Sequence, residues 1–224
     1  MVSFSPEDRA RVSAAVGAAE RGSNGEIVTI IADKSDSYHD VGLHYAVLAM
    51  LLVPALLAIL PQSAADRTLG LFAAWDEAVT RGALLAALFV ALALTFLLVR
   101  YLLAWPALRM ALTPGATKTR RVRRRAVELF RAAAERRTTG RTGILLYLSL
   151  LEHRAEIVAD EAIHSKVAPE IWGEAMAALL EQVKAGRPAD GMARAVEMIG
   201  AVLAEHFPVG EGDANELPDR LITL

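Results

Sequence analysis

Seven acidic and histidine side chains lie directly after apolar runs of the chain, where they could bind a cation or take part in acid–base chemistry. In chain order they are Asp33, Asp36, Glu152, His153, Asp160, Glu161 and His164. Carboxylate oxygens are the ligands that Mg²⁺ and Ca²⁺ prefer, and such sites need no cysteine, which this chain lacks. The alternative is structural: Asp33 and Asp36 form a loop, and Asp160 caps the turn that follows it.

The runs that precede these side chains are predicted to be three β-strands. Residues 26–31 and 144–150 are rich in isoleucine, valine and leucine, whereas residues 155–159 alternate polar and apolar at their start, as strands near an edge do. A helical pattern separates the first two strands, which favours a parallel pair with a right-handed crossover. The third strand is expected to form a hairpin with the second. Asp160 and Glu161, which follow the third strand, would then lie at the opposite edge of the sheet from the side chains that follow the first two strands.

Helices are predicted before, between and after these strands. Ser5, Pro6 and Asp8 form a capping-box signal for the first helix, and glycine or proline punctuates the others. The expected helices cover about residues 6–20, 119–137, 169–184 and 188–207. Tyr147 and Trp172 are expected to be core or helix-packing residues rather than platforms for a ligand. The order of elements predicts an α/β fold with a small mixed sheet flanked by helices.

Two uncharged apolar runs interrupt this pattern between the first and second strands. They cover residues 43–60 and 82–99, and each approaches the roughly 20 apolar residues that cross about 30 Å of hydrocarbon. In lipid every backbone amide is bonded within its own segment, so both runs must be helices. We predict a transmembrane hairpin over residues 43–105, with spans at about 43–60 and 82–103. The alternative is a pair of helices buried in a large soluble core.

Positive charge is concentrated just after the second run. Residues 100–142 hold twelve Lys/Arg and two Glu, whereas residues 61–81, which link the two spans, carry only Arg67 and Arg81. By the positive-inside rule both termini are expected in the cytoplasm and the linking loop outside. The arginines of residues 120–125 are expected to meet anionic lipid headgroups. Nucleic acid is the less economical partner, because no aromatic side chains are interleaved with them.

The sequence therefore divides into four parts. Residues 1–42 hold the first helix and strand, residues 43–105 the hairpin, residues 106–208 the rest of the α/β domain, and residues 209–224 a flexible acidic tail. The first part is too short to bury a core alone, so we expect segments from both sides of the hairpin to build one domain. An even number of spans is required for the two segments to meet.

Several stretches of this domain match one known family. They are residues 25–28 for the first strand, 142–154 and 155–164 for the second and third strands, and 185–191 before the last helix. Together they resemble the TPM domain family, over about residues 1–37 and 119–208. The resemblance implies an α/β sandwich, and it implies an association with acid phosphatase activity and metal binding. Most relatives face a lumen, the periplasm or the exterior, whereas the charge rule places this domain in the cytoplasm.

Asp160, Glu161 and His164 lie in the strongest part of the resemblance, so we predict them as the metal ligands, with Mg²⁺ or Ca²⁺ as the cation. P-loop, nucleophile-elbow and zinc-protease motifs are absent from the sequence, and no catalytic residue is assigned. The sequence predicts a multi-pass protein of the bacterial inner (cytoplasmic) membrane that acts as an interaction or assembly module, with other membrane proteins as partners. The alternative is a weak metal-dependent hydrolase similar to acid phosphatases.

Overall fold

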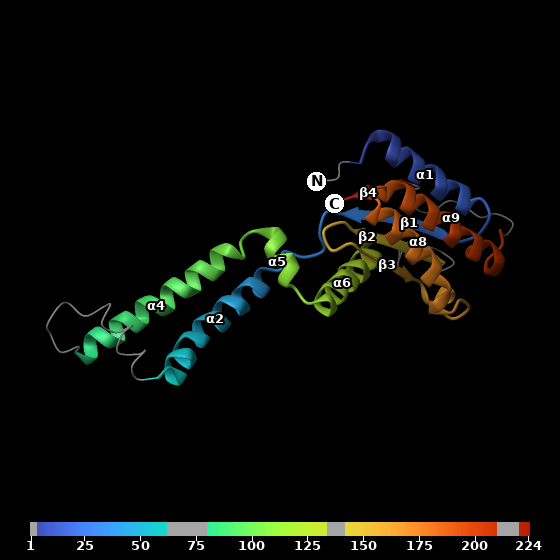
Figure 1. Ribbon diagram of the computed structural model, residues 1–224. Helices are drawn as coiled ribbons and strands as arrows, with labels where there is room; N and C mark the ends of the chain where they lie inside the picture. Colours follow the sequence, from blue (N-terminus) through green and yellow to red (C-terminus); the bar gives the residue numbers. More distant parts are fainter. Residues whose placement is uncertain (1–3, 62–79, 134–141, 210–219) are drawn as a thin grey trace. The chain divides into compact units, whose positions relative to one another are not determined.

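The computed structural model describes residues 4–61, 80–133, 142–209 and 220–224. The chain forms two compact units, one made of Met1–Asp36 with Gly115–Leu224 and the other of Ser37–Pro114. We call the first the α/β unit and the second the hairpin unit (Figure 1). The predicted α/β fold with a mixed sheet flanked by helices is confirmed.

The α/β unit contains a four-stranded sheet with the order β3-β2-β1-β4. Its central strands, β1 (Glu26–Ala32) and β2 (Gly143–Ser149), run parallel in a register that pairs Ile27 with Ile144. Strand β3 (Arg154–Ala159) is antiparallel to β2, so both predicted strand pairings are confirmed. Because β1 and β2 are hydrogen-bonded neighbours, the hairpin unit is an insertion in the connection between them.

The last strand, β4 (Ile222–Thr223), lies parallel to β1 at the other edge of the sheet. Leu224 N extends the pairing by donating to Ile31 O at 2.9 Å. The predicted loose tail is therefore wrong for its final residues, while residues 210–219 lie outside the described part of the chain. A two-residue strand carries too little sequence pattern to be predicted, and it forms because β1 offers an edge to pair with.

Both faces of the central strands are buried, as expected for parallel strands covered by helices. Alternate strand residues belong to two separate clusters, one on each side of the sheet. On one side lie α1 (Pro6–Glu20), α8 (Trp172–Lys184) and α9 (Pro188–His206). The strand residues of this cluster are Ile27, Ile31, Ile144, Leu146 and Leu148. On the other side lies α6 (Gly115–Ala133). The strand residues that meet it are Val28, Ile30, Ala32, Leu145 and Tyr147.

Local sequence signals set some of the helix boundaries. Ser5 Oγ accepts a hydrogen bond from Asp8 N, and the Asp8 carboxylate accepts one from Ser5 N, which is the predicted capping box. Helix α6 begins at Gly115, earlier than the predicted start. A 3-10 turn (Pro169–Ile171) precedes α8, and the short helix α7 (Glu161–His164) is absent from the sequence prediction.

The hairpin unit contains two long helices, α2 (His39–Ile59) and α4 (Arg81–Leu102), which pack against each other. Both are long and apolar enough to cross a membrane, and α4 buries none of its residues. Helix α2 begins four residues before the predicted span at 43–60 and ends one residue before its end, and α4 is displaced by one residue from the predicted span at 82–103. Most of the linking loop, residues 62–79 with Trp75, lies outside the described residues.

A short helix that the sequence did not predict, α5 (Pro106–Leu112), follows α4. Arg109 on this helix is buried, and its Nη1 lies 3.1 Å from His39 Nδ1 at the start of α2. Tyr45 Oη donates a hydrogen bond to Leu112 O at 3.0 Å. These polar contacts tie α5 to the first turns of α2, at the end of the hairpin unit where the chain enters and leaves it.

Candidate functional site

The carboxyl-terminal ends of the parallel strands β1 and β2 lie side by side, as the sequence predicts. A buried polar cluster lies at these strand ends. Its centre is Glu152, whose carboxylate accepts hydrogen bonds from Ser35 N at 2.8 Å and from Ser149 Oγ at 2.5 Å. Glu152 and Ser149 are buried. Since Ser35 precedes the hairpin unit and Glu152 follows it, this carboxylate joins the two segments of the α/β unit.

Tyr147 extends the polar cluster into the core. Its hydroxyl oxygen lies 3.0 Å from Ser35 Oγ, and its ring is fully buried on the α6 side of the sheet, as predicted for a core residue. Burial raises the pKa of Tyr147, and hydrogen bonds with Ser35 and Ser149 offset part of that rise. The phenol therefore stays protonated near neutral pH and acts as a structural hydrogen-bonding group.

The other side chains that the sequence predicts at these strand ends are ion-paired or exposed. Asp36 Oδ2 lies 3.1 Å from Arg121 Nη1 and 3.4 Å from Arg124 Nη2, both on α6, while Asp33 and His153 are exposed. His153 has φ +47°, the left-handed conformation, in the turn between β2 and β3. The cluster is thus a structural link whose carboxylates are bonded within the α/β unit.

The three predicted metal ligands follow β3 in the chain, and their side chains differ in burial and in hydrogen bonding. Asp160 is buried, and its Oδ2 accepts a hydrogen bond from Gly143 N at 3.0 Å. Glu161 and His164 are exposed side chains of α7. Within the residues that the structure describes, no group of three or more acidic or histidine side chains is placed to hold a metal ion. The predicted Mg²⁺ or Ca²⁺ site gains no support from this arrangement, because Asp160 instead satisfies the backbone amide that opens β2.

A groove with a volume of about 540 Å³ runs along the outer edge of β3. Strand β3 is the last strand on this side of the described sheet, and its residues 156–159 all line the groove. Successive side chains of a strand point to opposite faces, so a groove lined by four successive residues follows the edge of the strand. Its volume falls within the range of about 300–1,000 Å³ that is typical of ligand clefts.

Helices from the two layers form the walls of this edge groove. Arg123 and Val127 of α6 line one side, and Trp172 and Met176 of α8 line the other. His164, at the end of α7, also lines it. The edge groove therefore has two different walls, one from each layer that covers the sheet.

Glu156 is the half-buried carboxylate of the edge groove. It pairs with Tyr147 of β2, which faces α6, so the Glu156 side chain also points to the α6 wall. Burial raises the pKa of Glu156, and the positive charges of Arg123 and Arg154 offset part of that rise. The α6 wall is therefore charged, whereas the α8 wall is apolar and aromatic.

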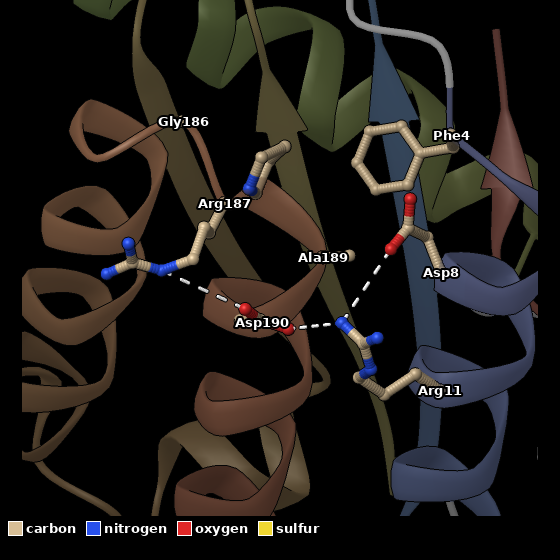
Figure 2. A pocket seen from close by; sticks show the side chains of 8 residues that line it. Phe4, Asp8, Arg11, Gly186, Arg187, Ala189 and Asp190 are labelled. Carbon is tan, nitrogen blue, oxygen red and sulfur yellow. Dashed lines mark hydrogen bonds and ion pairs between the residues drawn. The ribbon is translucent and has the colours of Figure 1, made fainter.

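A second, smaller pocket of about 250 Å³ lies between α1 and the start of α9 (Figure 2). Arg11 of α1 is ion-paired with Asp190 of α9 and lies 3.7 Å from the Asp8 carboxylate. Arg187 Nε lies 3.9 Å from the second oxygen of Asp190. Figure 2 shows the Arg11 guanidinium between the two carboxylates, so opposite charges neutralise each other in this pocket. We interpret these contacts as ion pairs that hold α1 against α9.

Sequence reasoning found only part of the edge groove. It singled out His164 as a metal ligand and assigned Arg123 to the lipid-facing basic cluster. The prediction of Trp172 as a core residue is confirmed, because its side chain is buried in the core cluster and only borders the groove. Glu156 was missed as a site residue. Its signal was the polar residue within the alternating pattern of the third strand, which indicates an edge but does not reveal the helices that wall it.

No protein-family model matches the chain, and no curated protein sequence does. Among solved structures, the chain is similar to the NMR structure of the BA42 protein from the psychrophilic bacterium Bizionia argentinensis. The two sequences are 16% identical, and the comparison covers 99% of this chain and 95% of that one with a TM-score of 0.56. This likeness supports the fold alone, and the resemblance to the TPM domain family stays a prediction.

Proposed function

We propose that this chain is a multi-pass protein of the bacterial cytoplasmic membrane that holds its α/β unit at the membrane surface as an interaction module. The observation that carries the proposal is the pair of helices α2 and α4, each with the length and composition of a membrane span. At about 1.5 Å per residue, the 21 residues of α2 and the 22 of α4 extend about 32 Å, which matches a hydrocarbon thickness of about 30 Å.

Large apolar side chains are exposed along both helices. Leu51 and Leu56 on α2, and Phe89, Leu94 and Leu98 on α4, are each more than half exposed. Contiguous apolar surface beyond a few hundred Å² is rare on proteins that face water. Lipid is the solvent in which such a surface is stable, which supports membrane anchorage.

The strand pairing supports a single side of the membrane for the α/β unit. Strands β1 and β2 are neighbours in one sheet although the hairpin unit separates them in the chain. The positive charge of α6 then favours the cytoplasmic side. Arg121 and Arg124 are ion-paired with Asp36, whereas Arg120 is exposed and can meet anionic lipid headgroups.

We favour an interaction module over a hydrolase because the described residues present a walled groove along the outer edge of β3. Alkaline carbonate extraction of native vesicles tests the anchorage: the full chain is expected in the pellet, while a soluble protein trapped in the same vesicles is released as a control. Release of the chain would overturn the anchorage. Mg²⁺-dependent hydrolysis of a generic phosphomonoester by the purified chain would overturn the interaction module in favour of the hydrolase.

A further inference from the structure

We propose that the edge groove binds one extended segment of a partner protein by strand addition, with acidic side chains of that segment toward α6 and apolar ones toward α8. The inference rests on the proposed function, because it names the partner chemistry of the interaction module. An extended peptide that joins the edge of a sheet gains affinity from main-chain hydrogen bonds and specificity from alternate side chains.

Strand β3 supplies the main-chain groups for this binding. Within the described sheet it pairs with β2 on one side only. Alternate residues of an antiparallel strand point their N–H and C=O groups away from the partner strand. Residues 156–159 line the edge groove, so the outward groups of this stretch face it. Four residues at about 3.3 Å each give about 13 Å of edge, the length of a short strand.

The two walls favour a single strand over a second copy of the chain. A second β3 would carry its own α6 and α8 to the groove, where they would meet the α6 and α8 already beside it. An extended segment carries no such layers. Strand β3 is also only six residues long, and short edge strands are one means by which proteins prevent the joining of whole sheets.

Charge complementarity selects acidic residues for one side of the segment. On the α6 side, the positive charges of Arg123 and Arg154 act on Glu156, which is the one carboxylate among the described residues that line the groove, and the Arg123 side chain is exposed there. On the α8 side the groove is lined by Met176, which is half-buried, and by Trp172, whose ring is only 8% exposed and belongs to the core cluster. Side chains of an extended segment alternate between the two sides, so acidic and apolar residues in alternation fit the edge groove.

The probe for this inference is a six-residue peptide of alternating glutamate and valine, blocked at both ends and labelled through a flexible linker. Fluorescence anisotropy with the full chain in detergent micelles is expected to show saturable binding, with a dissociation constant below about 1 mM. The same peptide N-methylated at alternate amides has lost main-chain donors, and we expect about tenfold weaker binding. A lysine–valine peptide of the same length is the charge control.

Gly173→Leu is designed to fill the edge groove without straining the fold. A Cβ at Gly173 would meet no atom within 4 Å, and this residue lines the groove near the start of α8. We expect about tenfold weaker binding of the glutamate–valine peptide with unchanged thermal unfolding. The matched control is Ala177→Leu, at an exposed position of the same helix outside the groove lining, and it should leave binding unchanged.

Arg123→Glu reverses the charge of the α6 wall. It is expected to weaken the glutamate–valine peptide about tenfold and to strengthen the lysine–valine peptide. Arg120→Glu makes the same change on α6 outside the groove lining and should have a much smaller effect.

Three outcomes would overturn the inference. They are no saturable binding by the unmodified chain, equal binding of the N-methylated peptide, and sedimentation showing that Gly173→Leu dissociates a dimer, which would assign the edge groove to a second copy. Carbonate extraction reports on the anchorage independently. If the chain stays with the membrane but does not bind the peptide, the proposed strand addition is wrong and the proposed membrane anchorage is unaffected.

Discussion

Helices α9 and α4 have similar lengths, 19 and 22 residues, and both are rich in alanine and other apolar residues, yet they bury very different surfaces. Helix α9 buries ten residues, and its outer face carries Arg194 and Glu197, whose charged groups lie 3.1 Å apart. Helix α4 buries none, and its charged residues, Arg81 and Arg100, lie at its ends. Apolar residues on one face are typical of a helix that packs on a core, whereas apolar residues all round are typical of a helix buried in a large protein core or in a membrane.

The largest expected effect comes from a core residue of α9. Leu203 is fully buried, and a Cβ at Gly25 would lie only 2.8 Å from Leu203 Cδ1, so the packing there is tight. Leu203→Ala should lower the free energy of unfolding by about 2–5 kcal/mol, measured by urea titration of the full chain in mild detergent. Leu94→Ala on α4 is the matched control and should change it by less than about 0.5 kcal/mol. Equal losses of unfolding free energy in the two variants would contradict this comparison, because Leu94 would then be as buried as Leu203.

The reverse experiment places a charge on the exposed surface of α4. Leu94 lies near the middle of this helix and is 61% exposed. In water Leu94→Lys would be almost neutral, but at the centre of a bilayer lysine costs about 2.5–3.5 kcal/mol on insertion scales. We therefore expect a smaller fraction of this variant to resist carbonate extraction. Leu151→Lys, at an exposed leucine of the α/β unit, should behave like the unmodified chain. Identical extraction of the two variants would indicate that α4 faces water.

A smaller effect is expected at the polar link across the insertion. Glu152→Ala leaves Ser35 N and Ser149 Oγ without their acceptor inside the α/β unit, which should cost about 1–3 kcal/mol of unfolding free energy. Glu170→Ala, at an exposed glutamate, controls for the loss of a charge. Amide hydrogen exchange should show faster opening at the carboxyl ends of β1 and β2. If exchange there is unchanged, the carboxylate does not join the two segments.

The pH dependence at Glu156 gives the most subtle test. Its pKa in the folded chain is raised above the ordinary value of 4.5, so the folded state holds a proton that the unfolded state releases at lower pH. The unmodified chain should therefore lose stability relative to Glu156→Gln as the pH rises from 4.5 through the folded-state pKa, and differ least below 4.5. Thermal unfolding of both proteins at about pH 4 and pH 7 measures this, with exposed Glu181→Gln as the control. A difference that does not change with pH would show that Glu156 is not desolvated.

The arrangement of the central strands could be predicted from the sequence because their signals are local and strong. Residues 26–31 and 144–150 are rich in isoleucine, valine and leucine, and the connection rules for strands then give the parallel β1–β2 pair and the β3 hairpin. The two long helices of the hairpin unit were equally predictable, since uncharged runs of that length have few other structures.

The features that could not be predicted depend on contacts between distant segments. Strand β4 is two residues long and exists because β1 offers it an edge. Asp160 was predicted as a ligand because it lies in the strongest part of the TPM resemblance, and its hydrogen bond from Gly143 N depends on the pairing of β2 with β3, which no local pattern shows. The edge groove combines residues of α6 with residues of β3, α7 and α8 that come later in the chain, so no local pattern contains it.

The most direct test of the central claim is the sidedness of single cysteines, because the chain has no cysteine of its own. Arg9→Cys and Lys184→Cys label the two segments of the α/β unit, and Ser63→Cys labels the connection between α2 and α4. In spheroplasts with an intact cytoplasmic membrane, a membrane-impermeant maleimide should react with the cysteine at position 63 at once. It should react with positions 9 and 184 only after permeabilisation. Reaction of all three positions before permeabilisation, or of positions 9 and 184 on different sides, would contradict the account.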